Sequence, residues 1–298
     1  MRAELLSPLE LDFLWESFGG GELPYPLEVR SHGATLDERD QLRRHTLAAL
    51  VQRGAADGRG RPEPHIEDFF EVLAGSEVSL DSVHLTAPNT PPLLAVAASL
   101  GGQGMLAVRD ERGFHLHPAP ADGLASAIIS LLPPAPRGSE KSITVPLEQL
   151  LTGTGADFLQ RRSPGDGTAA RSGSVEGGGG RRAGGRLSAD EDRKALARLQ
   201  AQPRLRGGQI GANARNRMGG KVRPPVLSWF DTDDGRYFTQ ASRGHDGRDW
   251  ITIAPADVPS LRHRLSEMLS GAASTVANPT ESRPTRSTGG RPTFGQSS

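Results

Sequence analysis

Residues 113–132 read GFHLHPAPADGLASAIISLL, and residues 249–269 read DWITIAPADVPSLRHRLSEML. Each stretch begins with a short run typical of a β-strand, continues with Ala-Pro-Ala-Asp, and ends with apolar residues at positions i, i+4, i+7 and i+8. That last spacing is one face of an amphipathic helix. Proline suits the first position of a helix and aspartate suits its first turn, so Ala-Pro-Ala-Asp predicts a helix start. The repeated unit therefore predicts two similar halves, each built of strands that lead to a helix.

The composition restricts the class of protein. The chain has 298 residues, of which 35% are apolar, 37 are glycine and 23 are proline, so we expect part of it to be unfolded. Its 35 bases balance its 35 acids, which argues against a general binder of nucleic acid or of anionic membranes. The absence of cysteine excludes disulfides and thiol chemistry. The first residues show no secretory signal and no run of 18 apolar residues exists, so a cytoplasmic protein is expected.

The first half is predicted from helix caps and from turns between apolar runs. A helix is expected from Ser7-Pro8 to Phe18, ended by Gly19, and a second helix begins with the capping box of Thr35 and Glu38. Residues 23–29 hold two prolines and are expected to be an extended or edge segment. Further helices are predicted at 66–73, from Asp122 to Pro133, and from Pro146 to about Phe158. Strands are predicted at 77–85, 93–100, 105–108, 114–117 and 143–145, and their short turns indicate antiparallel neighbours.

The second half follows a stretch of different composition. Residues 160–186 contain nine glycines, six arginines and two acids, so they are predicted to be a disordered insert, and residues 271–298 a disordered tail. Ser188 and Glu191 form another predicted capping box. Strands are predicted at 208–214, 226–231, 236–241 and 250–254, with a helix from about 255 to 269. The predicted organisation is an N-terminal half at 1–159, the insert at 160–186, a C-terminal half at 187–270 and the tail at 271–298.

No motif of known chemistry emerges from the sequence. The stretches Gly177–Arg182 and Gly219–Lys221 lack the ending of a phosphate-binding loop. His115 and His117 share one face of a strand but have no third ligand nearby, and Asp231, Asp233 and Asp234 lack the spacing of a calcium loop. We therefore predict no catalytic residue, no cofactor and no metal.

A basic run alternates with apolar residues early in the second half. Because the net charge of the chain is zero, a solvated strand face is favoured over a nucleic-acid site. The run comprises Arg204, Arg206, Arg215, Arg217, Lys221 and Arg223.

Several segments, in this order, resemble the EspG family of proteins associated with ESX (type VII) secretion in actinobacteria. The resemblance spans roughly residues 4–270, outside the insert. No single segment is diagnostic, but their number, order and spacing make the match fairly specific. The segments are 11–16 (LDFLWE), 21–27 (GELPYPL), 31–33 (SHG), 130–136 (SLLPPAP), 208–211 (GQIG), 229–232 (WFDT), 235–237 (GRY) and 250–255 (WITIAP).

The resemblance implies both a fold and a function. The fold would be α+β: a central, mainly antiparallel sheet in two quasi-twofold related halves, flanked by helical bundles. The function would be that of a cytosolic chaperone or adaptor that binds a helical secretion substrate, a PE–PPE-like heterodimer or a WxG-type protein, without inserting into a membrane. It would cover the apolar tip of that substrate with its sheet, its C-terminal helical part and the loop after the second strand. Here that loop is Thr86–Pro92, which is short and rich in proline.

The resemblance also directs attention to a set of partner-binding candidates. Large aromatics and arginine serve well as anchors at interfaces. Trp229 has a competing interpretation as a core residue, and Arg236 and Tyr237 alternate along a strand, so one of them is expected to face out. The candidates are Asn89, Thr90, Gln209, Trp229, Arg236 and Tyr237.

Two other functions stay open at this point. One is an enzyme whose site is assembled from scattered residues such as His115, His117, Asp231 and Asp233. The other is a scaffold associated with nucleic acid through the arginine-rich insert. An enzyme of this size usually displays a recognisable constellation of residues, which favours the binding protein.

Overall fold

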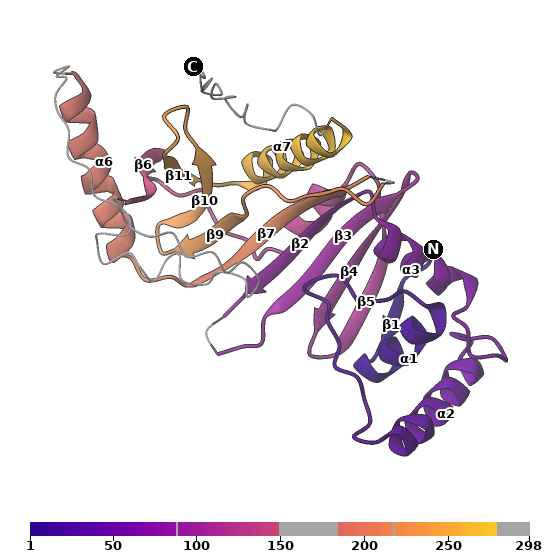
Figure 1. Cartoon of the computed structure of the whole chain (residues 1–298). Helices are drawn as coiled ribbons and strands as arrows, with labels where there is room; N and C mark the ends of the chain where they lie inside the picture. The colour runs from indigo at the N-terminus through magenta and orange to yellow at the C-terminus, as the bar shows by residue number, and fades with distance from the viewer. Residues whose placement is uncertain (88, 149–183, 217, 279–298) are drawn as a thin grey trace, which may run out of the picture.

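The computed structural model describes residues 1–87, 89–148, 184–216 and 218–278. Its central feature is an eleven-stranded sheet in the order β1-β5-β4-β3-β2-β7-β9-β10-β11-β6, with β8 paired to the side of β7 (Figure 1). Neighbouring strands in this order are antiparallel. The strands are β1 (Glu4–Leu6), β2 (Val78–Leu85), β3 (Leu93–Leu100), β4 (Gln103–Asp110), β5 (Gly113–Pro120), β6 (Ile143–Pro146), β7 (Arg206–Arg215), β8 (Lys221–Val222), β9 (Leu227–Thr232), β10 (Gly235–Arg243) and β11 (Asp249–Pro255).

The order of elements repeats along the chain. In the first half, the short strand β1 is followed by helices, by the four antiparallel strands β2 to β5, and by a helix. In the second half, β6 is followed by a helix, by β7 and β9 to β11, and by a helix. In each half the short first strand returns to pair with the last strand, β1 with β5 and β6 with β11. The two halves meet where β2 pairs antiparallel with β7, so the predicted quasi-twofold α+β architecture is confirmed.

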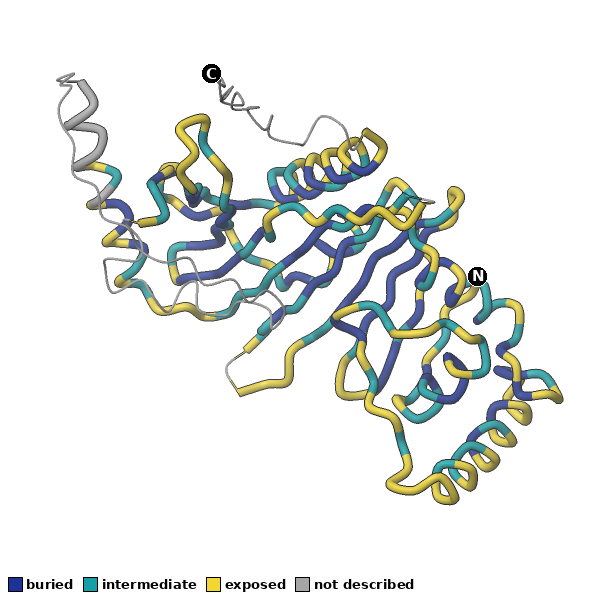
Figure 2. The backbone as a smooth tube through the Cα atoms, in the orientation of Figure 1, coloured by how far each residue is buried: buried dark blue, intermediate teal, exposed yellow. Residues whose placement is uncertain are grey.

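Helices cover both faces of the sheet. The helices are α1 (Pro8–Phe18), α2 (Leu36–Gln52), α3 (Pro64–Gly75), α4 (Leu124–Ile129), α6 (Gly184–Ala201) and α7 (Val258–Ala277). One core joins α1 to α3 with one face of β3 to β5, and a second joins α4 and α7 with the opposite face of both halves. A third core places α6 against β6 and the strands of the second half, on the same face as α1 to α3. Figure 2 shows the strands as the most deeply buried part of the chain.

The caps of the first helices follow the sequence closely. The hydroxyl of Ser7 accepts a hydrogen bond from the backbone N–H of Glu10, whose carboxylate accepts one from the N–H of Ser7. Gly19 ends α1 in the left-handed conformation, with φ of 80°. Thr35 caps α2 as expected, but the carboxylate of Glu38 accepts from Ala34 rather than from the cap residue. These local rules therefore place the starts of α1 and α2 to the residue.

Several boundaries differ from the expectations. Pro120 and Pro255 are the last residues of strands, so the helix starts follow later, and Asp257 is the N-cap of α7. The helix α6 begins at Gly184, so Ser188 lies inside it and is not its cap, and residues 184–186 belong to the helix rather than to an insert.

The end of the chain and two smaller segments also differ. The helix α7 runs to Ala277, which removes residues 271–277 from the predicted tail. Its last turns are held by a small core of Ala214, Ala272 and Val276. Residues 23–29 form no strand, whereas β8 was not expected.

Some predictions fall outside the described residues. These are the rest of the insert, the rest of the tail, and all but the first residues of the helix expected from Pro146 to Phe158. Among the described residues, no helix is long and apolar enough to cross a membrane.

Candidate partner-binding surface

Three of the six candidate residues lie at one end of the sheet. Gln209 lies on β7, opposite Val83 of β2 and Ser228 of β9. The next residues along these strands place Leu85 opposite Gly207, so the loop that follows β2 lies at the end of the sheet where β7 begins. That loop carries Asn89 and Thr90, both exposed. The structure therefore brings Asn89, Thr90 and Gln209 to a common region.

The side chains around Gln209 form a strip that we call the central strip, made of Val83, Gln209 and Ser228. Directly opposite residues share a face of a sheet, so these three side chains lie on the face that carries α1 to α3 in the first half and α6 in the second. All three are only partly buried, unlike the neighbouring apolar residues of both halves. Among the described residues, the central strip lies between the two groups of helices on this face and belongs to neither of the cores that they cover.

Trp229 lies on the opposite face and is 1% exposed. Its indole N–H donates to Nδ1 of His84 over 3.1 Å, and both side chains are buried. Gly208 lies against both rings, and a Cβ there would come within 2.4 Å of the carbonyl oxygen of Val83. The interpretation of Trp229 as a core residue is therefore correct, because the second core packs α4 and α7 over this face of the sheet.

Arg236 is 4% exposed, which contradicts its expected role as an outward-facing anchor. Its guanidinium donates to both oxygens of Asp231 and to the carbonyl oxygen of Pro133, and lies 4.7 Å from the centre of the Trp229 ring. Arg206 donates to the same Asp231 carboxylate and to the carbonyl oxygen of Pro134. We call the group Asp231, Arg206 and Arg236 the arginine clamp, because it ties the segment after α4 to the strands of the second half.

Tyr237 is also fully buried, on the other face of β10. Its ring stacks on Phe230 with 5.6 Å between centroids, its hydroxyl donates to Asp234 and it accepts the backbone N–H of Glu140 at 3.0 Å. Burial and the carboxylate of Asp234 raise the pKa of the phenol. The expectation that one of Arg236 and Tyr237 faces solvent is wrong, because both faces of β10 are covered: one by the arginine clamp and the other by the core under α6.

His84 is buried in the same layer as Trp229. Burial, together with the positive charge of Arg236 nearby, lowers the pKa of His84 to about 4. Because Nδ1 accepts from the tryptophan, the proton of the neutral ring lies on Nε2, which has no hydrogen-bond partner among the described residues. His84 is thus a neutral core histidine at physiological pH.

The basic run is largely exposed, as the sequence predicted, but several of its members also hold the fold together. The exposed members are Arg204, Arg215, Lys221 and Arg223. Arg223 reaches across β7 to the carboxylate of Asp81, which is 4% exposed, and also donates to Asn213 at 2.7 Å. The ion pair raises the pKa of the Arg223 guanidinium. Arg204 lies 3.3 Å from the centre of the Phe230 ring, and the partial desolvation of its guanidinium there lowers its pKa to about 10. With Arg206 in the clamp, three of these bases serve the fold, while Arg217 lies outside the described residues.

The scattered catalytic residues are not brought together. His115 and His117 lie on β5, whereas Asp231 lies on β9 and Asp233 in the turn after it. Four strands separate β5 from β9, a distance of about 24 Å at the usual strand spacing. The two histidine rings stack at 6.3 Å, and no group of three potential ligands among the described residues could hold a metal ion.

A sequence model of the EspG family matches residues 7–267. The chain belongs to the EspG family. Among solved structures, the chain is similar to the Mycobacterium tuberculosis type VII secretion system chaperone EspG5, solved in complex with a PE25-PPE41 dimer. The TM-score is 0.62 at 13% identity, and the match covers 91% of this chain and 96% of that one, which establishes a shared fold. A comparison with curated proteins finds no match.

Three of the eight segments that resemble the EspG family meet at the arginine clamp. Residues 130–136 provide the carbonyl acceptors, 229–232 provide Trp229 and Asp231, and 235–237 provide Arg236 and Tyr237. These three segments therefore build the fold rather than an exposed surface, whereas the segment 208–211 carries Gln209 of the central strip. The sequence analysis missed Val83 and Ser228, because their position beside Gln209 depends on a strand register that no short-range pattern reveals.

Proposed function

We propose that this EspG family protein is a cytosolic chaperone of an ESX (type VII) secretion system, which binds a helical substrate of the PE–PPE kind and keeps it soluble for export. Membership of the family carries this proposal. The shared fold with a chaperone solved in complex with a PE25-PPE41 dimer supports it. The protein acts by covering an apolar tip of its substrate, without catalysis and without a cofactor.

The proposed binding surface is the central strip together with the loop residues Asn89 and Thr90. The equivalent face of the first half lies beneath α1 to α3, so only one such surface is offered for each chain within the described residues. Trp229, Arg236 and Tyr237 contribute indirectly, by holding β9 and β10 rigid beneath and beside the strip. A single rigid surface predicts one substrate heterodimer for each chaperone.

Shielding needs no source of energy in this chain. A substrate with an exposed apolar patch of more than a few hundred Å² tends to self-associate. An interface of standard size, about 1,600 Å² in total, is enough to outcompete that association. Because the chain contains no phosphate-binding loop motif, release of the substrate is assigned to the secretion machinery.

The test is co-expression with a PE–PPE pair encoded in the same genome, followed by co-purification and titration calorimetry. The full chain should raise the soluble yield of the pair. Q209R, which places a long charged side chain on the central strip, should weaken binding about tenfold and leave the melting temperature unchanged. N89A combined with T90A should weaken it about threefold. S126R is the matched control, because Ser126 is exposed on α4, on the opposite face of the sheet.

Unchanged affinity in folded Q209R and in the loop variant would exclude the proposed surface. Equal substrate solubility with and without this chain would exclude the chaperone function. Capture of a WxG-type protein in place of the PE–PPE pair would keep the chaperone function and change its substrate class.

A further inference from the structure

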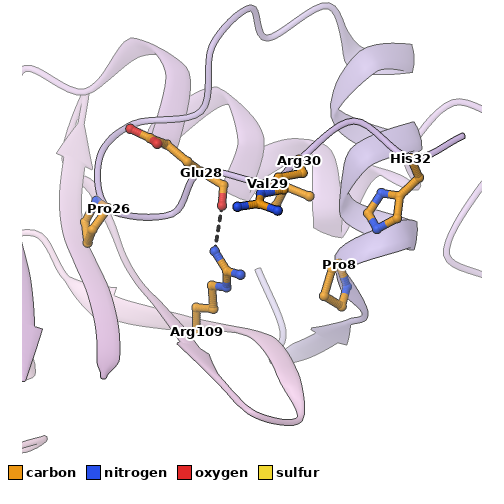
Figure 3. A pocket seen from close by; sticks show the side chains of 7 residues that line it. All are labelled: Pro8, Pro26, Glu28, Val29, Arg30, His32 and Arg109. Carbon is orange, nitrogen blue, oxygen red and sulfur yellow. Dashed lines mark hydrogen bonds between the residues drawn. The ribbon is translucent and has the colours of Figure 1, made fainter. Parts of the chain in front are cut away.

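A shallow hollow of about 580 Å³ lies on the first half, built from residues that the central strip does not use. It lies between the start of α1, the irregular segment that joins α1 to α2, and the end of β4. Figure 3 shows its lining from close by. The lining residues are Pro8, Pro26, Glu28, Val29, Arg30, His32 and Arg109.

Two arginines point into this hollow from different parts of the chain. The side chain of Arg109 is fixed in place: its Nη1 donates to the backbone carbonyl of Glu28 over 2.6 Å, and its guanidinium lies 5.3 Å from the centre of the Phe114 ring. Arg30 is exposed and makes no hydrogen bond or ion pair with any described residue. The carboxylate of Glu28 turns away from both guanidinium groups (Figure 3).

The carboxylate that contacts His32, another residue of the lining, is already engaged. Asp12 accepts from the backbone N–H and from the ring of His32, and from the guanidinium of Arg39. These contacts, in which hydrogen bonds from Arg39 and His32 outweigh the cost of burial, hold the pKa of Asp12 below its usual value. Among the described residues, neither Arg30 nor Arg109 forms an ion pair with a carboxylate.

This arrangement is unlike that of the other well-placed arginines. Arg39, Arg206 and Arg223 each pair with a partly or fully buried aspartate. Guanidinium groups prefer carboxylates, with which they form parallel, charge-assisted hydrogen bonds. The walls beside the two arginines are apolar, formed by Pro8, Pro26 and Val29. The hollow thus has the chemistry to receive a carboxylate carried next to an apolar side chain.

We propose that this hollow binds an acidic peptide segment of a second protein partner, in which a glutamate or aspartate is flanked by apolar residues. Net charge disfavours an occupant from the parts of this chain that lie outside the described residues. Residues 149–183 carry five arginines against three acids, and residues 279–298 carry three arginines against one glutamate. Charge complementarity therefore points to another protein, which binds whether or not a substrate occupies the central strip.

The experiment measures binding of a labelled peptide to the full-length protein by fluorescence anisotropy. The probe is acetyl-Ala-Leu-Glu-Val-Glu-Leu-Ala-amide, and its matched control carries glutamine in place of both glutamates. The acidic peptide should bind and the glutamine peptide should bind at least tenfold more weakly. Affinity should fall as salt rises from about 0.05 to 0.5 M, because exposed charge pairs are screened.

Variants assign the binding to the hollow. R30Q should weaken binding about threefold and R30E about tenfold, the range expected for exposed charge pairs. R109Q should weaken peptide binding at least as much. The melting temperature of R109Q is also measured, because this substitution removes the contact with Glu28. R262E is the matched control, since Arg262 is exposed on α7 and forms no ion pair with a described residue.

Two results would overturn the proposal. One is that the acidic and glutamine peptides bind with equal affinity. The other is that R30E and R262E lower the affinity for the acidic peptide to the same extent. Co-purification of the PE–PPE substrate with R30E is measured in parallel and should be unchanged. The experiments can therefore reject the proposed peptide site without rejecting the substrate-binding function, and the reverse.

Discussion

The two halves of the sheet share a topology but are stabilised differently. In the first half, β3 and β4 carry small and medium apolar residues on both faces, among them Ala95, Val96, Ala97 and Ala98. Helices α1 to α3 cover one face and α4 covers the other, so these strands lie in the middle of an apolar sandwich. Burial of apolar surface, at about 25 cal/mol for each Å², is the main favourable contribution here.

The second half relies in addition on charged and polar side chains that are buried beside its strands. Asp231, Arg236, Thr239 and Gln240 are each at most 6% exposed. Gln240 accepts from Arg264 of α7 over 2.5 Å, and the arginine clamp ties the segment after α4 to β9 and β10. A single helix, α6, covers the face that three helices cover in the first half. The face that carries the central strip therefore has less helical cover in the second half, whereas the arginine clamp and the Gln240–Arg264 pair lie on the opposite face.

The comparison predicts that different kinds of substitution destabilise the two halves. Substitutions in the arginine clamp should have the largest effect on the free energy of unfolding. D231A leaves Arg236 buried without its counter-ion, and removing one partner of a buried pair costs about 4 kcal/mol. Urea denaturation of the full chain should show this loss in the free energy of unfolding. D110N is the matched control, because the pair of Asp110 with His115 is exposed and should contribute less than about 1 kcal/mol. Equal losses in the two variants would refute the contrast between the halves.

The first half should instead be destabilised by the loss of side-chain volume in its apolar core. Phe70 is fully buried and packs edge-on against Trp15 at 5.1 Å and against Phe18 at 5.6 Å. F70A should therefore lower the free energy of unfolding by about 3 to 4 kcal/mol, and F70L by about 1 kcal/mol, because leucine fills most of the space. The same urea titration measures both. A loss below about 1 kcal/mol for F70A would show that this core is not closely packed.

A pH titration should probe the junction of the two halves, where His84 of β2 contacts Trp229 of β9. His84 is buried as the neutral ring, and its folded pKa of about 4 lies below the value of 6.5 expected when unfolded. Between these values the unfolded chain binds the extra proton, so stability is fully present above pH 6.5 and is lost as the pH falls toward 4. The difference of about 2.5 pKa units corresponds to about 3 kcal/mol.

H84Q isolates this contribution, because glutamine keeps an acceptor for the indole of Trp229 and does not titrate. From pH 7 to pH 4, the wild type should lose about 3 kcal/mol more than H84Q in the free energy of unfolding. Carboxylates such as Asp12 and Asp257, whose pKa values are lowered, also weaken the fold in acid, but they do so equally in both proteins. Parallel stability curves for the two proteins would show that His84 does not carry the effect.

Local rules predicted much of the fold. Ser7 with Glu10, and Gly19 after Phe18, set the ends of α1, and Asp233-Asp234-Gly235 marked the hairpin of β9 and β10. The end of α7 was missed because Gly271 lowers helix propensity by about 1 kcal/mol, which packing of Ala272 and Val276 offsets. The sequence pattern could not show this tertiary contact.

The binding surface was harder to predict than the fold. Alternation along β10 indicated that Arg236 or Tyr237 faces outward, but alternation assigns residues to faces and does not say whether a face is covered. The segment after α4, distant in sequence, covers one face, and α6 covers the other. Exposed positions follow from how distant segments pack, whereas helix ends follow from neighbours in sequence.

The smallest effect is expected from the stretch between the halves. Residues 160–183 are rich in glycine and arginine and poor in apolar residues, so their composition predicts that they add no core to either half. Their deletion should leave the melting temperature within about 2 °C of the wild type, while D231A lowers it strongly. Limited proteolysis should first cut within this stretch and leave two fragments that stay associated through β2 and β7. A fall of about 5 °C or more on deletion, roughly 1 to 2 kcal/mol for a domain of this size, would show that the second half, with its thinner helical cover, depends on these residues.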